Sequence, residues 1–231
     1  RTARIVHIPN GVDVQMLGRP QPRPAELPET IQLNQYLLFL GRLVQRKGAD
    51  LLIAAFAQTA ARHELTLVIA GEGPEELQLR MQAAGLSVRE RVYFLGRVDG
   101  ATKIWLLQNA LCCVTPSRCS EAFPLCVLES FAAGRPVLAT RIPGLEELVR
   151  PGRTGWLVAP DDGRALAQGI GDAAANPERA LAMGGDAQRL AQQFDWRRVA
   201  LRHLQLYSRL LAERVVSARR KHAAETSTAY A

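Results

Sequence analysis

Short apolar runs, each bounded by glycine or proline, alternate with helix-like segments along most of this chain. The runs are four to six residues long and cover 36–40, 65–70, 91–95, 111–115, 136–139 and 155–158. Runs that are apolar at nearly every position are typical of strands buried on both faces of a parallel sheet. The helix-like segments between them cover 48–62, 74–84, 100–110, 124–134 and 144–149. This alternation predicts βαβ units, and therefore an α/β fold with a Rossmann-like, doubly wound parallel sheet.

The two ends of the chain depart from this alternation. Residues 4–8 predict one further strand, which the Pro-rich segment 18–29 separates from Tyr36. From Asp161 onward the pattern is helical, and apolar residues spaced three or four apart after Trp196 predict an amphipathic last helix. Starts of the three expected helices are indicated by the capping carboxylates Asp161 and Asp162, by Pro177 and by Asp195. We expect four parts: an interdomain linker with the first strand at 1–35, a Rossmann-like domain at 36–194, a C-terminal helix at 195–216 and a polar, frayed tail at 217–231.

The overall composition excludes several classes of protein. Apolar residues make up 48% and charged residues 22% of the 231 residues, which argues against a wholly disordered chain. The longest clear apolar run, 51–57, is much shorter than the roughly 18 residues that a membrane span needs. Four cysteines lack the spacing of a zinc site and are expected to be reduced thiols of a cytoplasmic protein: Cys112, Cys113, Cys119 and Cys126. Cys112 and Cys113 are adjacent in one expected strand, so they cannot both face the same core.

The charge of the chain is strongly positive and comes almost wholly from arginine. The sequence has 26 Arg and 3 Lys, and its net charge is +7. An excess of this kind fits anionic partners such as nucleotides, and it also fits a genome that favours arginine codons. The basic residues are scattered and aromatic residues are 6% of the chain, which is a poor match to a nucleic-acid platform.

Two loops that follow expected strands carry groups suited to an anion. Ligands of parallel sheets bind at the carboxyl ends of the strands. After the first run, residues 41–48 hold Arg42, Arg46 and Lys47 between two glycines at the entry to a helix. Free N–H groups and side-chain charges there can hold a diphosphate. A positively charged turn that is only solvated would have the same sequence pattern.

The second loop, 116–124, leads into an apolar helix with an acidic residue in it. Glu121 precedes that helix, and Pro124 is expected at its first position. Glu129 lies among apolar neighbours, where a carboxylate is costly unless it is hydrogen-bonded or paired. Two glutamates eight residues apart are common by themselves, so their meaning depends on the surrounding residues.

The surrounding residues resemble a known enzyme family. S-R-x-x-E-A-F-P-L-x-V-L-E-S-F-A-A-G-R-P-V-L-A-T, residues 117–140, resembles the E-x7-E region of retaining GT-B glycosyltransferases of family GT4. Further segments match in the family's order: I-P-N-G-V-D at 8–13, G-R-L-x-x-x-K-G at 41–48, V-I-A-G-E-G-P at 68–74, Y-F-L-G-R at 93–97 and G-W-L-V at 155–158. The resemblance extends from residue 5 to about residue 211.

The resemblance implies a site for a nucleotide-diphosphate sugar, with a UDP- or GDP-linked donor expected. Arg42 and Lys47 would clamp the diphosphate, Glu121 would contact the sugar hydroxyls and Glu129 the ribose, with Arg42, Lys47 and Glu121 as the catalytic group. Backbone at 96–98 would meet the base, and free amides at 123, 125 and 126 would support the phosphates. The expected donor-binding residues are Gly41, Arg42, Lys47, Gly71, Glu72, Arg97, Val98, Glu121, Ala122, Phe123, Pro124, Leu125 and Glu129. Many relatives have glycine where this chain has Pro124, which lacks an N–H, so a slightly altered phosphate geometry is expected.

The resemblance also implies what this chain lacks. GT-B enzymes have two Rossmann-like domains, and the match is to the C-terminal one, so an N-terminal acceptor-binding domain is expected to precede Ile8. The last helix of the family crosses back to that domain. No D-x-D triplet occurs in the sequence, so no metal and no other cofactor is expected. Association with the inner face of a membrane through a lipid-linked acceptor is a further expectation.

Three functions fit these residues. The first is a hexosyltransferase-type retaining glycosyltransferase that is inactive as this fragment. The second is a binding module that holds a nucleotide-sugar without turnover. The third, a GT-B sugar-nucleotide epimerase, is disfavoured because Arg42, Lys47 and the two glutamates occur together in the order of family GT4.

Overall fold

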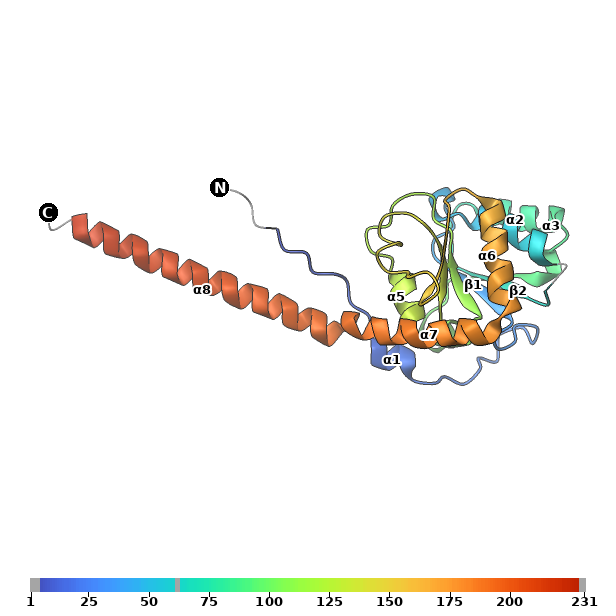
Figure 1. The fold of residues 1–231 in the computed structure, drawn as a ribbon, viewed down its shortest axis with the longest axis horizontal. Helices are drawn as coiled ribbons and strands as arrows, with labels where there is room; N and C mark the ends of the chain where they lie inside the picture. Colours follow the sequence, from blue (N-terminus) through green and yellow to red (C-terminus); the bar gives the residue numbers. More distant parts are fainter. Residues whose placement is uncertain (1–4, 61–62, 229–231) are drawn as a thin grey trace.

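A parallel sheet with helices on both faces forms the body of the protein. The computed structural model describes residues 5–60 and 63–228 (Figure 1). The sheet has six strands in the order β3-β2-β1-β4-β5-β6, and every neighbouring pair is parallel. The strands are β1 (Tyr36–Leu40), β2 (Thr66–Ala70), β3 (Val92–Gly96), β4 (Cys112–Thr115), β5 (Val137–Thr140) and β6 (Gly155–Val158). The chain moves outward from β1 to β3 and then returns to β4 beside β1, so the sheet is doubly wound, as predicted.

Each face of the sheet has its own hydrophobic core. One core is covered by α1 (Val14–Gly18), α4 (Gly100–Asn109), α5 (Leu125–Ala132) and α7 (Pro177–Ala191). The opposite core is covered by α2 (Ala49–Ala60), α3 (Glu76–Gly85) and α6 (Gly163–Ala175). Cys113 belongs to the first core and Cys112 to the second, which confirms that they face opposite ways. Near-continuous apolar strands result from this burial on both sides.

Polar side chains fix where the C-terminal helices begin. The Asp162 carboxylate accepts a hydrogen bond from the Ala165 amide at the start of α6. The Asn176 side chain accepts one from the Arg179 amide, so α7 begins at Pro177. Such caps satisfy amides that have no partner inside the helix. The start of α6 after Asp162 and of α7 at Pro177 were both predicted, whereas the Asn176 cap was not.

The N-terminal segment contains no strand among its described residues, so the strand expected at 4–8 is wrong for 5–8. Residue 4 lies outside the described residues. Instead, Asp13 caps the short helix α1, and Val12 forms an isolated bridge with Asp195. Residues 6–8 lie beside the last helix and not beside the sheet (Figure 1). A strand needs a neighbouring backbone to pair with, and this segment lies against helical side chains.

Two further expectations about elements are wrong. Residues 143–148 form turns and not a helix, with Gly144 at a φ of +87°. The last helix, α8 (Trp196–Thr228), follows the short 3₁₀ turn η3 (Gln192–Phe194) and continues past the expected end at 216. Alanine, arginine, lysine and glutamate dominate the sequence after 216, and all favour helix. Residues 229–231 of the expected tail lie outside the described residues.

The last helix extends away from the rest of the molecule (Figure 1). Its exposed apolar side chains are Trp196, Leu201, Leu204, Tyr207, Leu210 and Leu211, whereas Val199 of the same predicted stripe is buried. Within the described residues, no helix combines the length and the hydropathy needed to cross a membrane.

Candidate functional site

The loops that follow β1, β2 and β3 enclose a pocket at the carboxyl edge of the sheet. Its volume is about 480 Å³. It is lined by Leu40, Gly41, Arg42, Ala70, Gly71, Glu72, Gly73, Arg97 and Val98. The structure therefore brings together the part of the predicted site that precedes residue 100, apart from Lys47. The carboxyl edge of β1, next to the reversal of strand order, is the usual ligand position in such folds.

Glycine allows two of these loops to touch through their backbones. A Cβ on Gly71, whose φ is +152°, would lie 1.8 Å from the Gly41 carbonyl oxygen. A Cβ on Gly73 would lie 2.2 Å from the Leu43 carbonyl oxygen. Any larger residue would push the loops apart, so glycine at these positions shapes the pocket wall.

Lys47, in the loop that begins at this pocket, forms an ion pair with Glu121. The Lys47 ammonium donates to the Glu121 carboxylate at 2.6 Å, although the residues are 74 apart in the sequence. Lys47 is the last residue of the 3₁₀ turn η1 (Gln45–Lys47). This turn belongs to the loop that begins at Gly41, which lines the pocket. The side chains are 18% and 9% exposed, so neither charge is fully solvated. The pair was not predicted as a contact, although both residues were predicted for the site.

Neighbouring groups fix the position of Glu121. The Ser117 hydroxyl donates to the same carboxylate oxygen as Lys47, at 2.7 Å. The Thr140 hydroxyl donates to the Ser117 carbonyl at 2.6 Å, and the Glu121 amide donates to the Pro143 carbonyl at 3.1 Å. Both hydrogen bonds at Glu121 end on one carboxylate oxygen, so the described contacts leave the second oxygen available as an acceptor.

Glu129 has a lysine partner that the sequence analysis missed. The Lys103 ammonium of α4 donates to the Glu129 carboxylate of α5 at 2.7 Å. This ion pair satisfies the carboxylate that seemed costly among apolar neighbours. One signal was available: Lys103 is one of only three lysines, and two of the three now pair with the two glutamates of the E-x7-E pattern.

The N-terminus of α5 faces the same region. Pro124 was expected to be the first residue of the helix, but it is the residue directly before it. No side chain of the described residues caps the helix there. The Val127 amide donates to the Pro124 carbonyl, whereas the amides of Leu125 and Cys126 precede the first intrahelical acceptor. The partial positive charge at a helix start favours an anion.

The residues between Glu121 and this helix have different surroundings. Ala122 is exposed, whereas the Phe123 ring packs against the Phe194 ring with centroids 5.7 Å apart.

Burial raises the pKa of the Cys126 thiol in the first turn of α5, although the nearby Lys47 charge opposes the shift. A thiol with a raised pKa stays protonated at neutral pH and is a poor nucleophile. Among the described residues, no group of three His, Cys, Asp or Glu side chains is placed to hold a metal ion.

Comparison with known proteins places this chain in a family. The family described as Glycosyl transferases group 1 matches residues 29–190, which is more than half of the chain. A phosphatidyl-myo-inositol mannosyltransferase of Mycobacterium leprae is 36% identical over 207 residues, covering 87% of this chain and 53% of that protein. A glycogen synthase of Mycobacterium tuberculosis is 36% identical over 211 residues, covering 89% and 48%.

Solved structures share the fold. Sucrose-phosphate synthase of Thermosynechococcus elongatus superposes with a TM-score of 0.75 at 31% identity, covering 89% of this chain and 52% of that one. HepE of Anabaena, in complex with UDP, superposes with a TM-score of 0.73 at 25% identity, covering 87% and 56%. The chain therefore spans about half the length of the relatives it matches. By its sequence match and its Rossmann-like half of a GT-B fold, the chain belongs to the group 1 glycosyl transferases.

Proposed function

We propose that this chain is the donor-binding half of a retaining glycosyltransferase and that it binds a nucleoside diphosphate sugar. The observation that carries the proposal is the Lys47–Glu121 ion pair, whose lysine lies in the same loop as the pocket residue Arg42 and whose charges act on Cys126 in the first turn of α5. A lysine ammonium has three hydrogens, and Glu121 uses one of them. Lys47 therefore keeps donors for a phosphate while it stays fixed by the carboxylate.

The proposed chemistry is departure of the nucleoside diphosphate from the anomeric carbon of the sugar. Negative charge builds on the leaving phosphate oxygen, and prearranged positive groups lower that barrier. Arg42, Lys47 and the amides of α5 supply such groups. The second oxygen of Glu121 accepts from a sugar hydroxyl and orients the ring. We assign no side chain as a covalent nucleophile, in keeping with a front-face retaining reaction.

The base of the donor nucleotide is a further part of the proposal. HepE was solved with UDP, which supports a uridine nucleotide, and GDP is the alternative to be tested beside it. Gly96 to Val98 are proposed to contact the base, since Arg97 and Val98 line the same pocket as Arg42. Glu129 is proposed for the ribose, held in place by Lys103.

An absent acceptor half is proposed to complete the enzyme. The relatives are about twice as long as this chain, and α8 has exposed apolar side chains that a second domain could cover. The mannosyltransferase relative is named for a phosphatidyl lipid, which supports a lipid-linked acceptor at a membrane surface for this protein too. The competing proposal, a donor-binding module without turnover, is favoured by the same half-length match.

Calorimetric titration of the chain with UDP, GDP and the corresponding nucleosides tests the central proposal. We expect one diphosphate to bind and its nucleoside to bind at least about tenfold more weakly, because charge-assisted hydrogen bonds to the phosphates are lost. Equal affinity for nucleoside and diphosphate would contradict a phosphate site at Arg42 and Lys47.

A further inference from the structure

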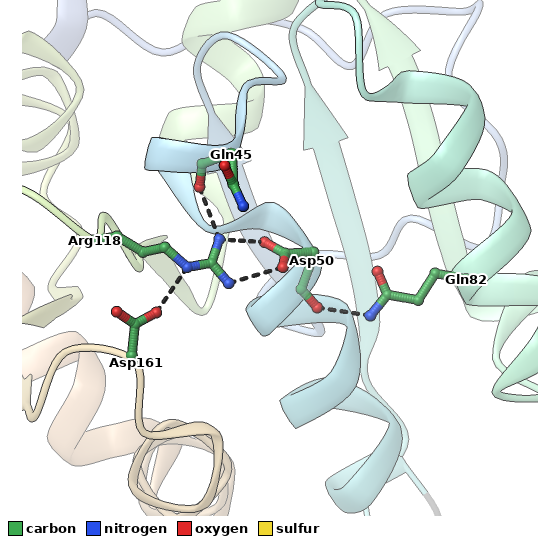
Figure 2. A network of polar contacts seen from close by, with 5 residues as sticks. All are labelled: Gln45, Asp50, Gln82, Arg118 and Asp161. Atoms are coloured by element: carbon green, nitrogen blue, oxygen red, sulfur yellow. Dashed lines mark hydrogen bonds and ion pairs between the residues drawn. The ribbon is translucent and has the colours of Figure 1, made fainter.

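Arg118 crosses between the two loops that carry the Lys47–Glu121 pair. It follows Ser117 and precedes Glu121 by three residues. Its Nη1 and Nη2 donate to the two carboxylate oxygens of Asp50 at 2.7 and 2.8 Å, and its Nε donates to Asp161 at 2.7 Å (Figure 2). All three guanidinium nitrogens therefore have partners inside the protein.

The same residue holds the turn in which Lys47 lies. Arg118 Nη1 donates to the Gln45 carbonyl at 2.7 Å, and the Arg118 amide donates to the Arg46 carbonyl at 2.8 Å. These carbonyls belong to the two residues directly before Lys47. Next to them, a Cβ on Gly48 would lie 2.1 Å from the Pro116 carbonyl oxygen, so the loops touch through their backbones.

The network anchors both loops to the helices behind them. Asp50 lies in the first turn of α2, and its carbonyl accepts from the Gln82 side chain of α3 at 2.9 Å (Figure 2). Asp161 precedes α6 and has a φ of +55°, a conformation that only glycine, asparagine and aspartate adopt readily. The contact with Arg118 holds this less favourable backbone in place.

Electrostatics favours this arrangement. Hydrogen bonds to Asp50 and then Asp161 raise the pKa of Arg118 against the opposing effect of its burial. The pKa of Asp50 is lowered: its burial acts to raise it, and the hydrogen bonds and charge of Arg118 outweigh that effect. A planar fork on both oxygens of a carboxylate is a geometry that lysine cannot reproduce.

We propose that Arg118 is a positioning residue for donor binding, which sets Lys47 at the correct distance from Glu121 without touching the donor. The inference rests on the proposed function, because it requires that Lys47 binds the diphosphate. Arg118 is joined by its own backbone to the loop of Glu121 and by hydrogen bonds to the turn of Lys47. Losing its side chain removes the hydrogen bond to Gln45 and the link to Asp50, so that the backbone bond from the Arg118 amide to Arg46 holds the turn less firmly relative to the glutamate.

The test is a double-mutant cycle between Arg118 and Lys47, read out as UDP or GDP affinity of the 231-residue chain. Arg118→Gln is expected to weaken binding about tenfold in the wild-type background and less than about twofold in the Lys47→Ala background, because coupled residues are not additive. Arg118→Lys is expected to cause a smaller loss that also disappears with Lys47→Ala. Arg189→Gln, which removes an arginine paired with Asp186 on α7, is the matched control and should leave affinity unchanged.

The outcomes separate this proposal from the proposed function. If Arg118→Gln lowers affinity equally with and without Lys47, its role is general stability and the positioning proposal is wrong. The same conclusion holds if affinity is unchanged in a folded Arg118→Gln variant. Arg118→Lys decides the question by the same criteria if Arg118→Gln does not fold. If wild type binds neither nucleotide, or if Lys47→Ala binds as well as wild type, the proposed function itself fails.

Discussion

Lysine is paired with both glutamates of the E-x7-E pattern in a chain that has 26 arginines and only three lysines. Lys47 and Ser117 share one oxygen of Glu121, whereas an arginine fork would take both oxygens. The compact ammonium therefore leaves part of the carboxylate and part of itself available. Arg42 lies exposed in the pocket wall, and its guanidinium has no hydrogen-bond or ion-pair partner among the described residues. We expect both cations to bind the diphosphate: Lys47 is held in place by Glu121, and Arg42 can move towards the ligand.

Removing either cation should weaken binding of the nucleoside diphosphate. Arg42→Ala and Lys47→Ala are each expected to lose about 2 kcal/mol, because each deletes a charge-assisted hydrogen bond. Calorimetry with UDP and GDP measures the loss, with Arg189→Ala as a charge-matched control on α7. If both variants keep wild-type affinity, the diphosphate does not bind where we place it.

Divalent metal should be dispensable for donor binding. The reason is that two cations and a helix N-terminus lie in the loops where we propose that the diphosphate binds, and they can neutralise its charge without a metal. The nucleotide affinity of the chain is expected to be the same in EDTA as in Mg²⁺ or Mn²⁺. A dependence of that affinity on either metal, restored after chelation by adding it back, would show that charge neutralisation has been assigned to the wrong groups.

The loops of the carboxyl edge are held by backbone contacts that only certain residues permit. The turn at 143–148 illustrates this, because Gly144 has a φ of +87° and a Cβ there would lie 1.7 Å from the Glu121 carbonyl oxygen. Glu121 is thus packed directly against a turn from the next βα unit. The turn replaces the helix that the sequence suggested, and it closes one side of the glutamate loop.

Gly144→Ala should disturb this contact. Positive φ and the short approach together are expected to destabilise the chain by about 1–3 kcal/mol, and the shift of Glu121 should weaken nucleotide-sugar binding. Thermal unfolding and calorimetry measure the two effects. Gly85→Ala at the end of α3 is the control, since a Cβ there meets nothing within 4 Å. Equal effects of the two substitutions would mean that the Gly144 contact does not matter.

The Arg118–Asp50 ion pair should make stability depend on acid pH. A folded pKa below the ordinary value means that Asp50 contributes stability above its ordinary pKa of 3.8, and that this contribution is lost as pH falls through the lower folded pKa. Urea unfolding should therefore show wild type more stable than Asp50→Asn at pH 7, with the difference shrinking below about pH 4. A difference that stays constant down to pH 2 would contradict this assignment.

In the whole molecule, the long helix α8 leaves the domain that contains the pocket (Figure 1). The pocket opens at the carboxyl edge of the sheet, and the relatives are about twice as long as this chain. In the proposed reaction, a glycosyl acceptor would have to reach the anomeric carbon from the side that faces the pocket. That side is expected to come from the other half of the full-length protein.

The chain alone should bind a nucleotide-sugar but should not transfer it. Holding two reactants in place supplies up to about 7–11 kcal/mol of catalysis, and a site open to water also weakens the electrostatic help. Mass spectrometry of mixtures with UDP- or GDP-sugars and soluble or lipid-linked acceptors should show at most slow donor hydrolysis. Efficient glycosylation by these 231 residues would overturn the half-enzyme proposal.

Local pattern by itself determined the sheet and the main helices, and it singled out the two loops of the candidate site. Apolar runs such as Tyr36–Leu40 bury both faces wherever they lie in a sheet, so their composition indicates their structure. The glycines and cations of the loop at 41–48 stand out because they follow such a run directly. The order of the motifs then indicated the family, which the sequence comparison confirmed.

Contacts between distant segments were decided only by the tertiary structure. Lys47 meets Glu121 across 74 positions, Lys103 meets Glu129 on a different helix, and Arg118 reaches Asp50 across 68. No spacing rule predicts these pairs, because each depends on how far loops from separate βα units extend over the edge of the sheet. The turn at Gly144 shows both influences: glycine permits its positive φ, whereas its close approach to the Glu121 loop is a contact that the sequence alone did not predict.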